Sequence, residues 1–257
     1  GETQASTYSL GVGNRSMLLG AEIQNPVCKE DSIKLTFKAT NLDGQPVSVE
    51  GNYKLYPVVG GAKSEEVMKG TPAYTGTFVS NKETLLPGWT SVPSGEYLLV
   101  MSAKDDQGRE VTGEEEVILF SIKDKRPPVD KAIWYYAENT SFDAAHPAVF
   151  YFGTSKKDAY VMMNLFSGNR MLESKVLRLS DSIERFEYPY KESYGNGLSA
   201  TFCFVKDGSV NQQTVRMTKR LPDKTLTMKW EVFRDKLRPG QEEEWKLTVK
   251  TPQGMPA

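Results

Sequence analysis

The residues that could carry out chemistry are few in this sequence. His146 is the single histidine among 257 residues, and it precedes Pro147. One histidine excludes zinc sites built from several histidines and leaves one candidate base for a Ser-His or Cys-His catalyst. Neither a glycine-rich phosphate loop nor a Gly-x-Ser-x-Gly nucleophile elbow occurs. We therefore expect His146 to be a loop residue and the chain to be no enzyme, with no cofactor and no metal.

Two cysteines and two neighbouring aspartates are the other reactive candidates. Cys203 lies in the apolar run 201–205, where its simplest role is that of a small buried hydrophobic residue. A disulfide to Cys28 is the alternative, and it would have to join two modules. Asp105 and Asp106 could offer oxygens to a calcium ion between modules, but they also suit a tight turn ending at Gly108.

The charge balance excludes some partners. The chain has 32 basic and 33 acidic residues, which gives a formal net charge of -1. Such a balance creates no long-range field for nucleic acid or for an anionic membrane. No apolar run approaches the roughly 20 residues that span a bilayer. With 39% hydrophobic and 11% aromatic residues, the chain can fill real cores.

Period-two alternation dominates the sequence and predicts strands. It is clearest at 33–39, 226–232 and 245–250, where apolar and polar residues alternate without a break. Further strands are expected in seven segments: 49–58, 97–103, 116–122, 148–152, 160–166, 174–179 and 198–205. Glycine turns separate them, and Asp207-Gly208 between two strands is a strong hairpin signal. At most one helical turn is expected, at 64–69. Many short strands of this kind predict an all-β fold of consecutive antiparallel sandwiches of the immunoglobulin or fibronectin III type.

An internal repeat divides the chain. Corresponding strands begin near Ile33, Val149 and Trp245, and the separations match the size of one immunoglobulin-like module. We expect an N-terminal strand segment at 1–20, a first module at 21–125, a second at 126–222, and the opening strands of a third at 223–257. Pro127-Pro128 lies in a polar linker that should be stiff, because neither proline donates to a sheet.

Several runs resemble the macroglobulin domains of bacterial alpha-2-macroglobulin-like proteins. The first is Leu237-Arg238-Pro239-Gly240-Gln241, which precedes an alternating strand. The second is Leu86-Pro87-Gly88-Trp89, followed by Pro93-Ser94-Gly95-Glu96-Tyr97 and then by Ala103-x-Asp105-x-x-Gly108. The third is Phe152-Gly153-Thr154-Ser155 with Asp158-Ala159-Tyr160-Val161. The resemblance covers nearly the whole chain. It implies a large periplasmic or cell-surface protein that traps proteinases through a cleaved bait segment and, in some members, an internal thioester.

The sequence lacks the thioester motif of that family. A thioester needs a Cys-x-x-Gln run, whereas Cys28 is followed by Lys29-Glu30-Asp31 and Cys203 by Phe204-Val205-Lys206. No active residue of the family can therefore be carried over. The resemblance implies a scaffold segment whose partners are the remaining domains of the polypeptide and, through the whole protein, target proteinases.

Aromatic residues offer the remaining candidate interaction surface. Tyr188, Tyr190 and Tyr194 could stack on a sugar or anchor a protein, or their rings could cover the edge of a sandwich. Trp134 and Tyr136 follow the proline linker with Tyr135 between them. These rings could bind a ligand at the junction, or alternate rings could pack into the second core and against the neighbouring module. The alternative function is an adhesin or carbohydrate-binding tandem, which would need a flat row of exposed rings.

Overall fold

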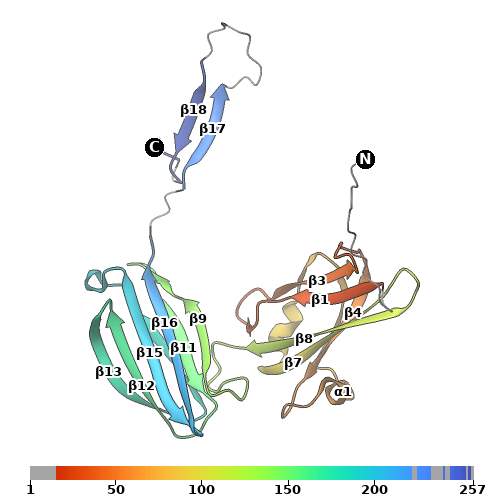
Figure 1. Cartoon of the computed structure of the whole chain (residues 1–257), viewed down its shortest axis with the longest axis horizontal. Coiled ribbons are helices and arrows are strands. Elements are labelled where there is room, and N and C mark those ends of the chain that lie inside the picture. Colours follow the sequence, from red (N-terminus) through yellow and green to blue (C-terminus); the bar gives the residue numbers. More distant parts are fainter. Residues whose placement is uncertain (1–15, 222–224, 233–239, 241–243, 253, 256–257) are drawn as a thin grey trace, which may run out of the picture.

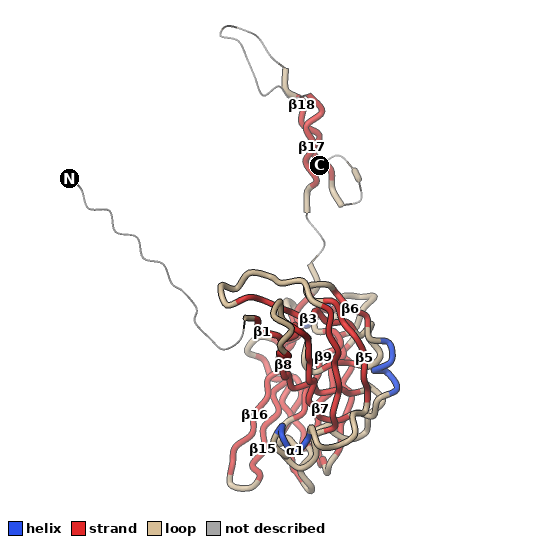
Figure 2. Tube along the Cα trace, turned by 90° about the vertical axis from the view of Figure 1, so that its right-hand side faces the viewer, coloured by secondary structure: helices blue, strands red, loops and turns tan. Residues whose placement is uncertain are grey.

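The computed structural model describes residues 16–221, 225–232, 240, 244–252 and 254–255. These residues are almost entirely strand and loop, which confirms the all-β fold class (Figures 1 and 2). The α-helix of the described part is α1 (Ser64–Val67), a single turn at the predicted place. Short 3-10 turns occur at Pro87–Ser91 and Glu192–Tyr194.

The first sandwich consists of two sheets, which are antiparallel except for one short strand. The smaller sheet has the order β1 (Met17–Glu22), β3 (Lys34–Asn41) and β6 (Glu83–Leu85). The larger has the order β2 (Val27–Cys28), β8 (Glu110–Phe120), β7 (Gly95–Lys104), β4 (Glu50–Pro57) and β5 (Tyr74–Val79). Within the larger sheet, the two-residue β2 is parallel to β8.

The second sandwich repeats this arrangement. Its smaller sheet has the order β9 (Trp134–Asn139), β11 (Ala148–Thr154) and β14 (Ser182–Tyr188). Its larger sheet has the order β10 (Ser141–Phe142), β16 (Ser209–Lys219), β15 (Gly197–Lys206), β12 (Ala159–Ser167) and β13 (Arg170–Leu179). The short β10 is parallel to β16, just as β2 is to β8.

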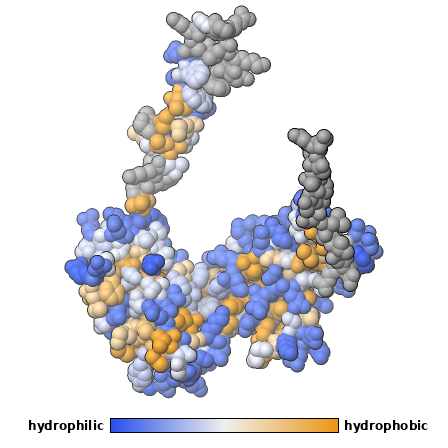
Figure 3. Space-filling view, viewed as in Figure 1, coloured by the Kyte–Doolittle hydropathy of each residue, from blue (hydrophilic) through white to orange (hydrophobic). Residues whose placement is uncertain are grey.

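The strand order of one sandwich therefore maps onto the other position by position. A third antiparallel pair, β17 (Thr227–Val232) with β18 (Lys246–Lys250), matches the pairs β1–β3 and β9–β11. It lies outside both sandwiches (Figures 1 and 3). The repeat predicted near Ile33, Val149 and Trp245 corresponds to β3, β11 and β18. The tandem modules thus share one topology.

Each sandwich has its own aromatic core, because alternate residues of both sheets point inward. In the first, Phe37 stacks on Phe78 with ring centroids 4.3 Å apart, and Trp89 is fully buried beside them. In the second, Phe152 stacks on Phe202 at 4.1 Å. These separate cores explain why two units form within one chain.

One predicted boundary falls inside a strand. β1 pairs with β3 along its whole length, from Met17 to Glu22, and Met17 is buried in the first core. A module start at residue 21 would cut this strand, so the first sandwich includes Met17. The second sandwich, from β9 to β16, lies within the predicted 126–222.

The predicted hairpin at Asp207-Gly208 is present. Both residues have positive φ, 51° and 75°, and they form a two-residue loop between β15 and β16. Two consecutive positive φ values are what a type I′ turn requires, and its twist matches that of the flanking strands.

Candidate interaction surfaces and the joint between modules

The strongest candidate for function is the joint between the two sandwiches. Phe120, the last residue of β8, contacts two rings of β9, with centroids 5.3 Å from Trp134 and 4.5 Å from Tyr136. Cys28 and Val129 complete this cluster, which we call the joint cluster. Phe120 is 2% exposed and Trp134 4%. Apolar area is therefore buried between the modules as it is inside each of them.

Alternation along β9 places these rings. Trp134 and Tyr136 point toward the first sandwich, whereas Tyr135 between them packs on the second core, 6.3 Å from Phe150. The sequence predicted this division of alternate rings. It did not identify their partners, Phe120 and Cys28, although Phe120 ends an apolar strand immediately before the polar linker.

Hydrogen bonds hold the linker to both modules. The carboxylate of Glu30, in the first sandwich, accepts hydrogen bonds from the Ser121 hydroxyl at 2.5 Å and from the Ile122 amide at 3.1 Å. The Ile183 amide of β14 donates to the Lys125 carbonyl at 3.0 Å. Burial alone would raise the pKa of Glu30, but these bonds to the carboxylate outweigh it and lower the pKa. Hydrogen bonds therefore restrain the linker in addition to the fixed φ angles of Pro127 and Pro128.

The two titratable groups inside the joint are kept neutral. Burial raises the pKa of the Cys28 thiol, which lies 3.4 Å from a carboxylate oxygen of Glu30. Burial also raises the pKa of Tyr136, with the nearby Cys28 and Asp31 adding to the effect. Cys28 is free and buried, and so is unsuited to act as a nucleophile.

The three tyrosines proposed as a surface do not form an open platform. Tyr188, Tyr190 and Tyr194 are half-buried and pack against the second core. Phe142 lies between the last two, with ring centroids at 5.4 Å and 6.4 Å. Burial raises the pKa of Tyr188 to about 12. Their rings cover one end of the sandwich.

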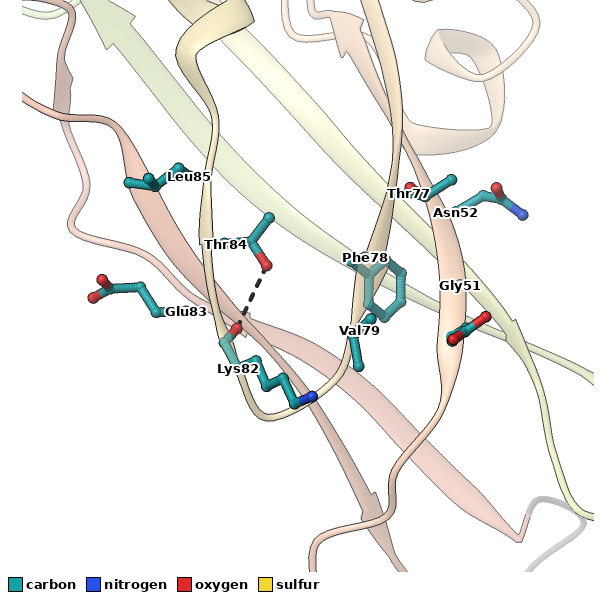
Figure 4. A pocket seen from close by; sticks show the side chains of 10 residues that line it. Gly51, Asn52, Thr77, Phe78, Val79, Lys82, Glu83, Thr84 and Leu85 are labelled. Carbon is teal, nitrogen blue, oxygen red and sulfur yellow. Dashed lines mark hydrogen bonds between the residues drawn. The ribbon is translucent and has the colours of Figure 1, made fainter.

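A groove opens at the side of the first sandwich (Figure 4). It has a volume of about 770 Å³ and lies between β6 and the outer edge formed by β4 and β5. Lys82, Glu83, Thr84 and Leu85 line one wall and Phe78 lies across from them. Charges of both signs and a 63% exposed Leu85 give it no clear ligand chemistry.

The remaining sequence candidates have local structural roles. The carboxylate of Asp105 accepts hydrogen bonds from the Ser16 hydroxyl, from the backbone amides of Gln107 and Arg109, and from the Arg109 side chain. His146 lies 2.8 Å from Asp143 within one loop. In the described ranges, no group of three or more His, Cys, Asp or Glu side chains could hold a metal ion.

The interpretation of Cys203 as buried is wrong. Cys203 is half-exposed on the outer face of β15, because its neighbours Phe202 and Phe204 point into the core. It lies in a different sandwich from Cys28, and both are free thiols.

No known protein family matches this chain, and no curated protein matches it either. Among the residues described, none of the helical segments has the length and apolar character of a membrane span.

Proposed function

We propose that this chain is a non-catalytic scaffold and interaction segment of an alpha-2-macroglobulin-like, proteinase-trapping protein. The observation that carries the proposal is the joint cluster, in which Phe120 of one module is packed between Trp134 and Tyr136 of the next. Supporting it are two modules of identical topology and the sequence runs that resemble macroglobulin domains.

A packed joint suits a protein that must transmit a rearrangement. If cleavage in one part of a large molecule is to move another, the modules between them must turn as rigid bodies. A flexible tether would absorb the motion instead. In this chain, buried rings of both modules meet in the joint cluster. Glu30 binds the linker on the side of the first module and Ile183 on the side of the second. The partners would be the other domains of the polypeptide and, through them, proteinases outside the cytoplasm, in the periplasm or at the cell surface.

The alternative function, carbohydrate binding by a tandem adhesin, draws no support from the rings that the sequence singled out for it. Sugar platforms need flat, solvent-facing rings. Tyr188, Tyr190 and Tyr194 are half-buried, and Trp134 is buried in the joint. We therefore favour the scaffold.

The test is a proteinase-trapping assay on the full-length polypeptide that contains this segment. After addition of trypsin, we expect limited cleavage, a change in hydrodynamic size and retention of the proteinase. Phe120→Ala combined with Trp134→Ala should leave the first cleavage unchanged and reduce retention. Tyr160→Ala, at a 62% exposed ring, is the matched control and should retain trypsin normally. A full-length protein that retains no proteinase would refute the proposal.

A further inference from the structure

The strand β13 is a long free edge. It ends the larger sheet of the second sandwich and pairs with β12 on one side. In the part of the chain that the structure describes, no strand pairs with its other side. Eight of its ten residues are exposed, including Val176 at 62%. Unpaired backbone groups along such an edge are a template for another strand.

Two opposite charges lie in the middle of this edge, on its inner face. Glu173 and Lys175 pair with Leu165 and Met163 of β12. Paired residues of antiparallel strands point to the same side, and these two partners are buried in the core. Glu173 and Lys175 nevertheless stay 42% exposed, in an ion pair of 2.9 Å. The sheet opposite has three strands against five and covers these two side chains only in part.

We propose that β13 pairs antiparallel with β13 of a second copy of this chain, forming a continuous sheet across a twofold axis at Ser174. Symmetric dimers use the same surface on both copies. With the axis at Ser174, Glu173 of each copy lies opposite Lys175 of the other, giving two ion pairs between the copies. Charge complementarity thus selects a second copy as the occupant.

Neighbouring registers are less favourable. Side chains opposite each other must lie on the same face, so the axis must pass through a residue. An axis at Glu173 sets two glutamates against each other, and one at Lys175 sets two lysines against each other, which is destabilising. An axis at Val176 places Glu173 opposite Leu179 and Lys175 opposite Leu177. Of these four registers, the one centred on Ser174 is alone in pairing opposite charges.

The ends of the strand tolerate this register. It would place Arg170 near Arg178 of the second copy, but Arg178 is already paired with Asp158 at 3.0 Å. A bulge at Leu172 also breaks the regular alternation before Arg170. On the outer face, Val176 would extend the apolar row that it forms with Met162.

Charged side chains on an inner face normally discourage pairing with arbitrary edges. Here the same charges would reject a non-complementary strand and accept an identical one, which is how specificity arises from repulsion as well as attraction. Because one strand pair buries little area, the dimer should be concentration-dependent.

Sedimentation equilibrium of the 257-residue chain tests the proposal. The mean mass should rise with concentration from 28.7 kDa toward twice that value. Glu173→Lys and Lys175→Glu, each alone, should weaken association about tenfold or more, since each sets like charges opposite one another. The double variant should restore it. Glu66→Lys, at an exposed position of α1, makes the same charge change in the other sandwich and should have no effect.

Mixing the two single variants gives the decisive result. In a heterodimer of Glu173→Lys with Lys175→Glu, both cross-strand pairs are again of opposite charge. A one-to-one mixture should therefore associate more tightly than either variant alone, which also demonstrates that both are folded. A chain that stays monomeric at all concentrations, a dimer insensitive to the single reversals, or a mixture that does not associate would each overturn the proposal.

Discussion

The ring of Phe120 lies 4.5 Å from the ring of Tyr136, at an interplanar angle of 63°. One residue ends the last strand of the first sandwich and the other belongs to the first strand of the second. Thirteen residues separate β8 from β9, yet the chain returns to pack one against the other. The modules are thus joined by side-chain packing as well as by the backbone.

Truncating Phe120 should destabilise the chain strongly. Removing a fully buried phenylalanine costs about 3–5 kcal/mol through lost transfer energy and the cavity left behind. Phe120→Ala should therefore lower the free energy of unfolding by that order in urea titrations. Leu85→Ala, at a 63% exposed site, should change it by no more than about 0.5 kcal/mol. Equal effects of the two substitutions would contradict the packed joint.

The joint should also restrict the angle between modules. Small-angle X-ray scattering should give a narrow distribution of dimensions for the wild type. Gly-Ser in place of Pro127-Pro128 should broaden it, because the prolines fix φ in the linker. Adding Phe120→Ala to that change should broaden it further, since the joint cluster then no longer holds the linker. Identical broad distributions for all three chains would show that the joint is not rigid.

The two thiols should differ in reactivity. Thiolate is the reactive form, and burial raises the pKa of Cys28. Cys28 therefore carries less thiolate at pH 8 than an ordinary cysteine and is shielded from reagents as well. Iodoacetamide followed by mass spectrometry should label half-exposed Cys203 first. Phe120→Ala should accelerate the labelling of Cys28 and leave that of Cys203 unchanged. Faster labelling of Cys28 in the wild type would contradict its burial.

Asp105 should contribute to stability in a pH-dependent way. The hydrogen bond from Ser16, followed by those involving Arg109 and Gln107, lowers the pKa of Asp105 from 3.8 to about 2. Because the folded pKa is the lower one, the stabilisation is fully present above the unfolded value and is lost as pH falls through this range. Asp105→Asn should reduce the melting temperature at pH 7.

The same difference in melting temperature should shrink as the pH is lowered from 3.8 to about 2. Asp106→Asn, at the exposed neighbouring position, is the control and should show little effect at either pH. A difference that stays constant across this range would mean that the Asp105 carboxylate does not stabilise the fold through its charge.

The sequence predicted the regular parts of the fold because alternation reports burial directly. β3 and β15 have one buried and one open face, so their apolar residues recur every second position. For β16, the hairpin signal at Asp207-Gly208 indicated that a strand follows the turn, but it did not give the strand's extent. Only Val215 and Met217 of its eleven residues are buried, so alternation does not mark its bounds.

The joint, too, could be predicted only in part from local patterns. Alternation indicated that Trp134 and Tyr136 share a face, but their partner depends on how the linker folds back, which no local pattern encodes. The interpretation of Cys203 as buried was wrong for a different reason. The overall apolar character of its segment was weighed above the alternation, which already placed Phe202 and Phe204 inward and Cys203 outward.

Trp230 and Trp245 lead to the last prediction. Both lie on the apolar phase of alternating segments, which predicts that they face one core and that Trp230→Ala costs about 3–5 kcal/mol at a fully packed site. The structure places their rings in edge contact, with centroids 6.0 Å apart, but leaves each 50% exposed. Trp230 lies in β17 and Trp245 immediately precedes β18, and these two strands belong to neither sandwich. The described residues therefore lack the core expected around the two rings.

Trp230→Ala should therefore leave the melting of the two sandwiches unchanged and remove only long-wavelength tryptophan fluorescence. Trp89→Phe, at a fully buried indole, should instead remove short-wavelength emission and lower the melting temperature. A two-stranded hairpin is only marginally stable by itself, so the apolar face of β17 and β18 needs a covering surface to become a core. If Trp230→Ala did lower the main melting transition, the hairpin would have to pack against a sandwich in solution.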